Sequence, residues 1–166
     1  MVNSMKRYML YILGALLVII ENGITNYFNI FDTSINLSII YMAIISLYVE
    51  DIDVILISIF IGVLKDITIG GIFGINALTL FLSSIFINNL KAKIYRESNI
   101  TIFALVFLIT FFDSILNIIA SSIVYVNYDM FNTIIKGLLI IPINNSIFSV
   151  IVFNIFKNTI LKLKED

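Results

Sequence analysis

The chain has 166 residues, of which 60% are hydrophobic and only 13% are charged, and its mean hydropathy is +1.08. Because soluble domains carry about 25% charged residues, a chain this short cannot bury so much apolar surface in one water-soluble core. We therefore interpret it as an integral membrane protein. Its apolar runs are continuous rather than alternating, which favours transmembrane helices over barrel strands.

The composition also excludes several kinds of chemistry. The chain has no Cys and no His, which removes thiolate chemistry, the common zinc ligands and the Ser-His and Cys-His hydrolases. The glycine-rich residues 70–74 lack the Lys-Ser/Thr ending of a phosphate-binding loop. We expect no cofactor, no metal site and no nucleic-acid partner.

In chain order, six apolar segments follow one another, and we expect each to cross the membrane, at roughly residues 8–28, 37–49, 54–69, 73–90, 99–126 and 134–156. The first follows a basic head, as in a signal peptide, but no small-residue cleavage site follows it. Residues 54–69 would make only about 24 Å of helix against about 30 Å of hydrocarbon. The second and third segments are therefore short spans, with a re-entrant hairpin as the alternative.

The placement of basic residues predicts the orientation of this all-α bundle of six transmembrane helices. With a cytoplasmic N-terminus, eight of the ten Lys and Arg residues fall on the cytoplasmic side: Lys6, Arg7, Lys91, Lys93, Arg96, Lys157, Lys162 and Lys164. The positive-inside rule thus favours both termini in the cytoplasm. The connections are short, so residues 1–166 are expected to form a single polytopic membrane domain.

Polar residues within the apolar segments are candidates for function, because ionisable groups there are costly. Gly62, Asp66 and Gly70 recur every fourth residue, which predicts one helix-packing face. Asp66 is expected to pair with Lys65 or with backbone donors. Glu21 is expected near the outer interface, where its charge costs little.

Three later segments carry narrow polar stripes with apolar opposite faces: Asn76, Thr79 and Ser83; then Thr110, Asp113, Asn117 and Ser121; then Asn145 and Ser149. This pattern predicts a bundle with a polar interior that contains Asp113, Asn117 and Asn145. The stripes fit either a transport path or ligand pocket, or hydrogen bonds that hold the helices together. Asp113 is expected to pair with Lys136.

One stretch resembles a known family. An apolar helix with Gly62 and Asp66, then Gly70, Gly71 and Gly74, then Asn76-Ala77-Leu78, is similar to the signature of the rod-shape-determining MreD family. The match covers about 17 residues, counted from Gly62 to Leu78 along the printed sequence. Lys65 departs from the family pattern, which has an apolar residue there. We take Gly62, Asp66, Gly70, Gly71, Gly74 and Asn76 as candidate helix-packing or partner-binding residues.

The resemblance implies a non-enzymatic scaffold of bacterial cell elongation and peptidoglycan synthesis in the inner membrane. Its implied partners are a single-span MreC-type protein and, through it, MreB, RodA and a class B penicillin-binding protein. The implied fold is similar to the S-components of energy-coupling-factor vitamin transporters. Such a substrate-binding S-component is the alternative function, although only Gly14-Ala15 stands where its coupling motif is expected. An intramembrane aspartyl protease using Asp66 and Asp113 lacks a second motif.

Overall fold

The computed structural model describes residues 4–25, 33–69, 72–124 and 130–161. Regular structure in these ranges is helical, which confirms the all-α expectation. The elements are α1 (Ser4–Ile20), η1 (Glu21–Thr25), α2 (Leu37–Tyr48), α3 (Asp51–Ile69), α4 (Ile75–Leu90), α5 (Asn99–Val124), α6 (Met130–Ile135), η2 (Lys136–Ile140) and α7 (Ile141–Leu161). The two η elements are π-helical turns that continue α1 and join α6 to α7.

The predicted segments correspond to these elements with shifted ends. α3 begins at Asp51 rather than at residue 54, and α4 begins at Ile75 rather than at residue 73. The last helical run covers 130–161 rather than 134–156. The predicted ends at residues 28 and 126 lie outside the described residues. Among the described residues, two helical stretches are long and apolar enough to cross a membrane, Asn99–Val124 and Phe131–Thr159.

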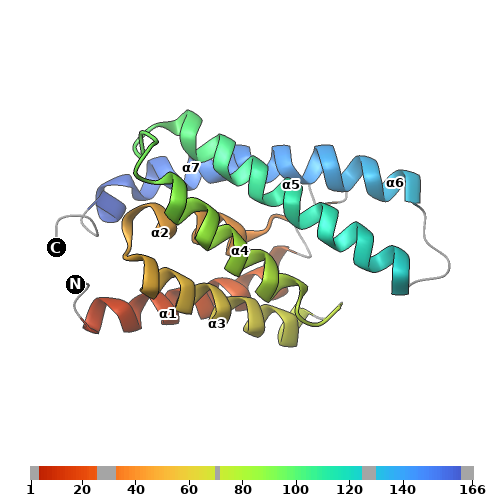
Figure 1. The fold of residues 1–166 in the computed structure, drawn as a ribbon, viewed down its shortest axis with the longest axis horizontal. Helices are drawn as coiled ribbons and strands as arrows, with labels where there is room; N and C mark the ends of the chain where they lie inside the picture. The colour runs from red at the N-terminus through yellow and green to blue at the C-terminus, as the bar shows by residue number, and fades with distance from the viewer. Residues whose placement is uncertain (1–3, 26–32, 70–71, 125–129, 162–166) are drawn as a thin grey trace.

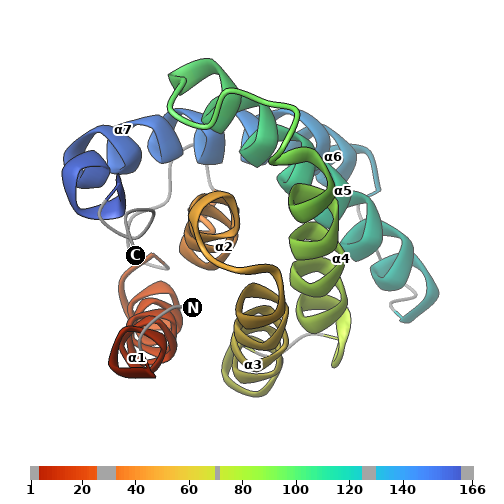
Figure 2. The same cartoon turned by 60° about the vertical axis from the view of Figure 1, so that its left-hand side comes forward.

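From α1 to α5 successive helices run in alternating directions along the long axis of the molecule, and α6 and α7 follow one another in the direction opposite to α5 (Figure 1). The start of α1, the connection from α4 to α5 and the end of α7 all lie at one end. At the opposite end α5 and α6 extend past the start of α4. α2 lies in the middle, with α1, α3, α4, α5 and α7 around it (Figure 2).

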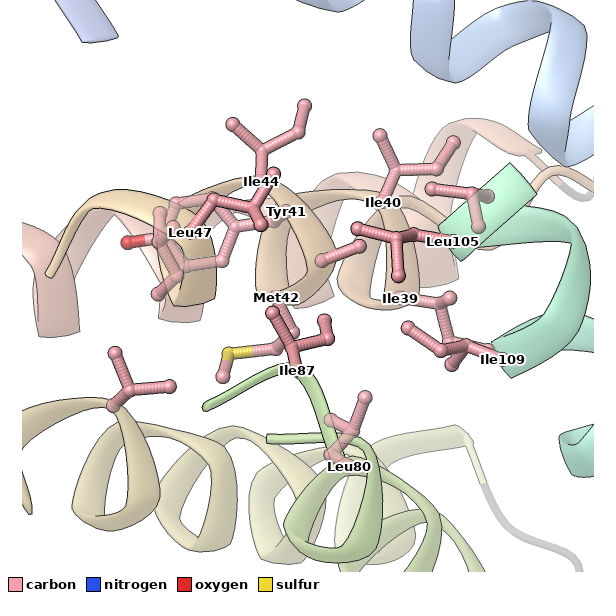
Figure 3. Close-up of a cluster of buried hydrophobic side chains, with 14 of the residues drawn as sticks. Ile39, Ile40, Tyr41, Met42, Ile44, Leu47, Leu80, Ile87, Leu105 and Ile109 are labelled. Carbon is pink, nitrogen blue, oxygen red and sulfur yellow. The ribbon is translucent and has the colours of Figure 1, made fainter. Parts of the chain in front are cut away.

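The central position of α2 follows from its composition. A helix that is hydrophobic all round has no face suited to water, so it is buried on every side. Residues 38–49 are all buried. Figure 3 shows Ile40 and Ile44 on one side of α2 and Met42 on the other, towards Leu80 and Ile87 of α4. With 12 residues, α2 is about 18 Å long, so it forms a core rather than a full-length span.

The π turn η2 has a local cause. Pro142 in the first turn of α7 has no N–H to donate and its ring clashes with the carbonyl four residues earlier, so the chain gains an extra residue in that turn. Gly137 within η2 packs on α5, where an added Cβ would lie 3.2 Å from the Ile118 side chain and 3.6 Å from that of Ser114. The glycine thus lets η2 pack closely on α5.

Candidate functional site

The buried side of α3 carries two parallel stripes that face different neighbours. Ser58, Gly62 and Asp66 face α4, since Ser58 Oγ lies 3.3 Å from Ser84 Oγ and an added Cβ on Gly62 would lie 2.8 Å from the backbone nitrogen of Ala77. The same Cβ would overlap the Ala77 Cα. Only glycine at position 62 lets the two backbones approach this closely, so this residue sets the spacing of α3 and α4.

Asp66 stabilises the first turn of α4 from outside that helix. Its Oδ1 accepts from the backbone N–H of Asn76 at 3.1 Å and from the Asn76 side-chain amide at 2.9 Å, and its Oδ2 accepts from the backbone N–H of Ala77 at 3.1 Å. Helix N-termini leave such N–H groups without intrahelical acceptors, and a carboxylate there also meets the positive end of the helix dipole.

The residue at the N-cap position explains why α4 needs a cap from another helix. That residue is Gly74, which has no side chain to accept a hydrogen bond. Its φ of 97° is left-handed, a conformation that glycine adopts without strain and that aims the chain from the turn into α4. Gly70 and Gly71, which the sequence placed in the same group, lie outside the described residues.

The residues of the family-like stretch therefore act within the chain. Gly62, Asp66, Gly74 and Asn76 together hold the α3–α4 corner, and the expected use of backbone donors by Asp66 is confirmed. Because α4 already covers the Gly62 face, a helix of another protein cannot pack on that face as well. At Gly62 the helix-packing role is therefore intramolecular, whereas the predicted partner-binding role of Gly70 and Gly71 stays a prediction.

The second stripe of α3 consists of the buried residues Ile57, Ile61 and Lys65, and Ile61 lies against Gly14 of α1. Lys65 Nζ lies 2.8 Å from Glu21 Oε1 and donates to Asn36 Oδ1 at 2.8 Å. Glu21 Oε2 in turn accepts from the Ser38 hydroxyl at 2.6 Å and from the Ser38 backbone N–H at 3.0 Å. Lys65 thus pairs with Glu21 and not with Asp66.

The position of Glu21 near the outer interface stays a prediction, but its side chain points into the bundle, where the residue is 7% exposed and pairs with Lys65. The sequence did contain the signal. Leu10, Gly14, Val18 and Glu21 recur at helical spacing, and all four are buried on the face that α1 turns inward.

The same network continues to the other half of the bundle through the N-cap of α2. Asn36 caps that helix by accepting from the Ile39 backbone N–H at 3.1 Å, and its own backbone N–H donates to Asn145 Oδ1 of α7 at 2.9 Å. The Asn145 amide reaches Thr110 Oγ1 of α5 at 3.5 Å. Asn145 is thus an interior residue, as predicted, and joins α2, α5 and α7.

Asp113 lies in the interior, as predicted, but without the expected partner. Its Oδ1 has no hydrogen-bond partner, and no described basic side chain pairs with it, Lys136 included. Thr79 of α4 and Asn117 lie beside it. Asn117, which was predicted to be interior, is exposed. Its amide folds back to the Asp113 carbonyl at 2.9 Å.

Comparison with protein-family models, with curated proteins and with solved structures finds no match. The site must therefore be judged from its own geometry. Among the described residues, no three Asp or Glu side chains gather as a metal site would require. Both Asp66 oxygens are engaged by α4, so the geometry suits helix association better than acid-base catalysis.

Sequence reasoning missed a second capping arrangement, at the basic end. Lys91 Nζ donates to the Val49 carbonyl at 2.9 Å, and Arg96 Nη1 donates to the Leu47 carbonyl at 3.0 Å. Lys91 also pairs with Asp51. Cations near the C-terminus of a helix satisfy its last carbonyls and oppose its dipole. The α4–α5 connection thus holds the end of α2, besides carrying the charge used to predict orientation.

Proposed function

We propose that the chain is a six-pass protein of the bacterial cytoplasmic membrane. The outward faces of its helices support this proposal, because large apolar side chains are exposed along α1, α3, α4, α5 and α7, for example Ile12, Phe86 and Leu108. A surface of this kind fits lipid and would aggregate in water. The short α2 and α4 would then be enclosed by, or tilted with, longer neighbours.

The distribution of charge supports an orientation with both termini in the cytoplasm. The start of α1, the α4–α5 connection and the end of α7 lie at one end of the bundle (Figure 1), and these segments carry Lys6, Arg7, Lys91, Lys93, Arg96 and Lys157. An excess of Lys and Arg at one end is the usual mark of the cytoplasmic side.

The function that we propose is that of a non-enzymatic scaffold in the cell-elongation machinery, similar to the MreD family. The observation that carries it is the α3–α4 corner, in which the family-like residues Gly62, Asp66, Gly74 and Asn76 form one structural unit. In this proposal the corner keeps the bundle rigid, and an MreC-type single-span helix docks on an outer apolar face. MreB, RodA and a class B penicillin-binding protein are then indirect partners.

The polar interior favours this proposal over a vitamin-binding S-component. Glu21, Lys65, Asn36 and Asn145 bond to one another and to the helix ends, which occupies the donors and acceptors that a ligand would otherwise use. Polar groups arranged in this way fix the register of packed helices.

Affinity purification of a tagged chain from native membranes tests the proposal against its alternative. We expect the MreC-type protein of the same bacterium to co-purify. Recovery of the membrane-embedded coupling subunit of an energy-coupling-factor transporter, without the MreC-type protein, would replace the scaffold with the S-component. An unrelated multi-pass protein of similar abundance, tagged identically, controls for membrane fragments.

A further inference from the structure

Asp113 is a buried carboxyl group with which no described basic side chain forms an ion pair. The side chain is 9% exposed, and its Oδ1 has no hydrogen-bond partner. Lys65 is the cation whose field reaches it, but Lys65 already holds Glu21 and Asn36 at 2.8 Å each. Glu21 is paired with Lys65, Asp53 with Arg7, and Asp66 accepts from the backbone of α4, so among the described buried carboxyl groups Asp113 alone has neither an ion pair nor a backbone donor. Buried charges of this kind are normally paired or bind a cation.

A buried hydroxyl from a second helix lies beside this carboxyl group. Thr79 of α4 is 1% exposed, and its Oγ1 lies next to Asp113 across the α4–α5 contact without forming a hydrogen bond of good geometry. A carboxylate and a hydroxyl supplied by two different helices are oxygen ligands of the kind that hard cations prefer.

A polar stripe leads from this position to the surface. Asp113 is buried, Asn117 one turn further along α5 is exposed, and Ser121 is half-buried. The stripe runs towards the end of α5 opposite the basic connection, where α5 extends past the start of α4 (Figure 1). We therefore place the entry of a cation at this end, along the side of α5 that carries Asn117 and Ser121.

We propose that Asp113 and the Thr79 hydroxyl bind one monovalent cation, H⁺ or Na⁺, which enters from the non-basic end of the bundle. The neighbouring charged side chains do not take the place of this cation. Glu21 is itself negative and is paired with Lys65, and α4 contributes no ionisable residue. The α2 hydroxyls of Tyr41 and Tyr48 donate to the Leu10 and Arg96 carbonyls, at 2.8 and 2.9 Å. Lys136 opens η2, which packs on α5 through Gly137.

The test measures thermal unfolding of the full-length protein in detergent by circular dichroism. NaCl is varied at constant ionic strength with N-methyl-D-glucamine as the replacement, and pH is varied separately without Na⁺. A cation that binds only the folded state raises Tm with its concentration. For Na⁺, we expect the Tm of the wild type to rise with NaCl at fixed pH. For H⁺, we expect it to rise as pH falls.

Asp113→Asn should abolish the dependence that the wild type shows. If the cation is Na⁺, Thr79→Val should raise the half-saturating concentration about tenfold, as expected for one lost ligand. Asp66→Asn is the matched control, because its carboxylate is already satisfied by α4, and it should keep the wild-type dependence at a lower Tm. If Asp66→Asn does not fold, Thr68→Ala serves as the control instead and should show the same cation dependence as the wild type. A wild type indifferent to both cations, or Asp113→Asn with an unchanged response, would overturn the proposal.

Discussion

Asp66→Ala tests most sharply whether the α3–α4 corner holds the bundle together. The substitution removes the acceptor of the backbone N–H groups of Asn76 and Ala77 and of the Asn76 amide. Each N–H left without an acceptor costs about 1–3 kcal/mol, and loss of a negative charge at a helix N-terminus costs about 0.3–1 kcal/mol. Because Asn76 and Ala77 are half-buried, water replaces part of this loss. We therefore expect about 3 kcal/mol.

For a chain of this size, 1 kcal/mol corresponds to a change in Tm of about 2–4 °C, so Asp66→Ala should lower Tm by roughly 6–12 °C. The assay is thermal unfolding in detergent, followed by circular dichroism. Thr68→Ala is the matched control, because Thr68 lies on the same helix with an exposed hydroxyl that bonds only the Leu64 carbonyl of its own helix. A Tm for Asp66→Ala as close to the wild type as that of Thr68→Ala would refute the capping role.

Three further substitutions or fusions test other parts of the structure. Gly62→Ala should lower the free energy of unfolding by about 2–3 kcal/mol, because the added Cβ meets the backbone of Ala77. Gly23→Ala, whose added Cβ would have nothing within 4 Å, should change it by no more than about 0.5 kcal/mol in the same unfolding assay. Equal losses for the two variants would contradict the close approach of α3 and α4. Lys65→Met should lower the free energy of unfolding by about 3–5 kcal/mol, because it leaves Glu21 unpaired. Adding Glu21→Gln should restore about 1–3 kcal/mol of this loss in a double-mutant cycle. Effects of the two substitutions that simply add would argue against the ion pair. An alkaline phosphatase fusion after Lys93 should be inactive and one after Asn127 active, and the reverse pattern would invert the orientation.

Helix positions could be predicted from the sequence because each apolar segment is continuous and bounded by polar residues. The all-helical fold and the interior positions of Asp66, Asp113 and Asn145 followed from this pattern and from the 3.6-residue period. The two π turns could not be placed, because a single extra residue leaves the hydrophobic pattern almost unchanged. The exposure of Asn117 depends on how neighbouring helices pack, which its own segment does not encode.

The partners of the buried charges were harder to predict, because they come from distant parts of the chain. Lys65 stands next to Asp66, yet helical geometry points adjacent residues to different faces, so Lys65 meets Glu21 and Asp66 meets α4. The capping of α2 by Lys91 and Arg96 joins residues more than 40 positions apart. Contacts of this kind follow from the packing of helices, and a single sequence does not specify that packing.

The central claim, that the chain is a scaffold for cell elongation, is tested most directly by depleting it in the bacterium that encodes it and measuring cell shape by microscopy. We predict that rods become spheres and that a plasmid copy of the wild type restores rods. Unchanged rods together with a newly acquired vitamin requirement would contradict the scaffold and favour the transporter subunit.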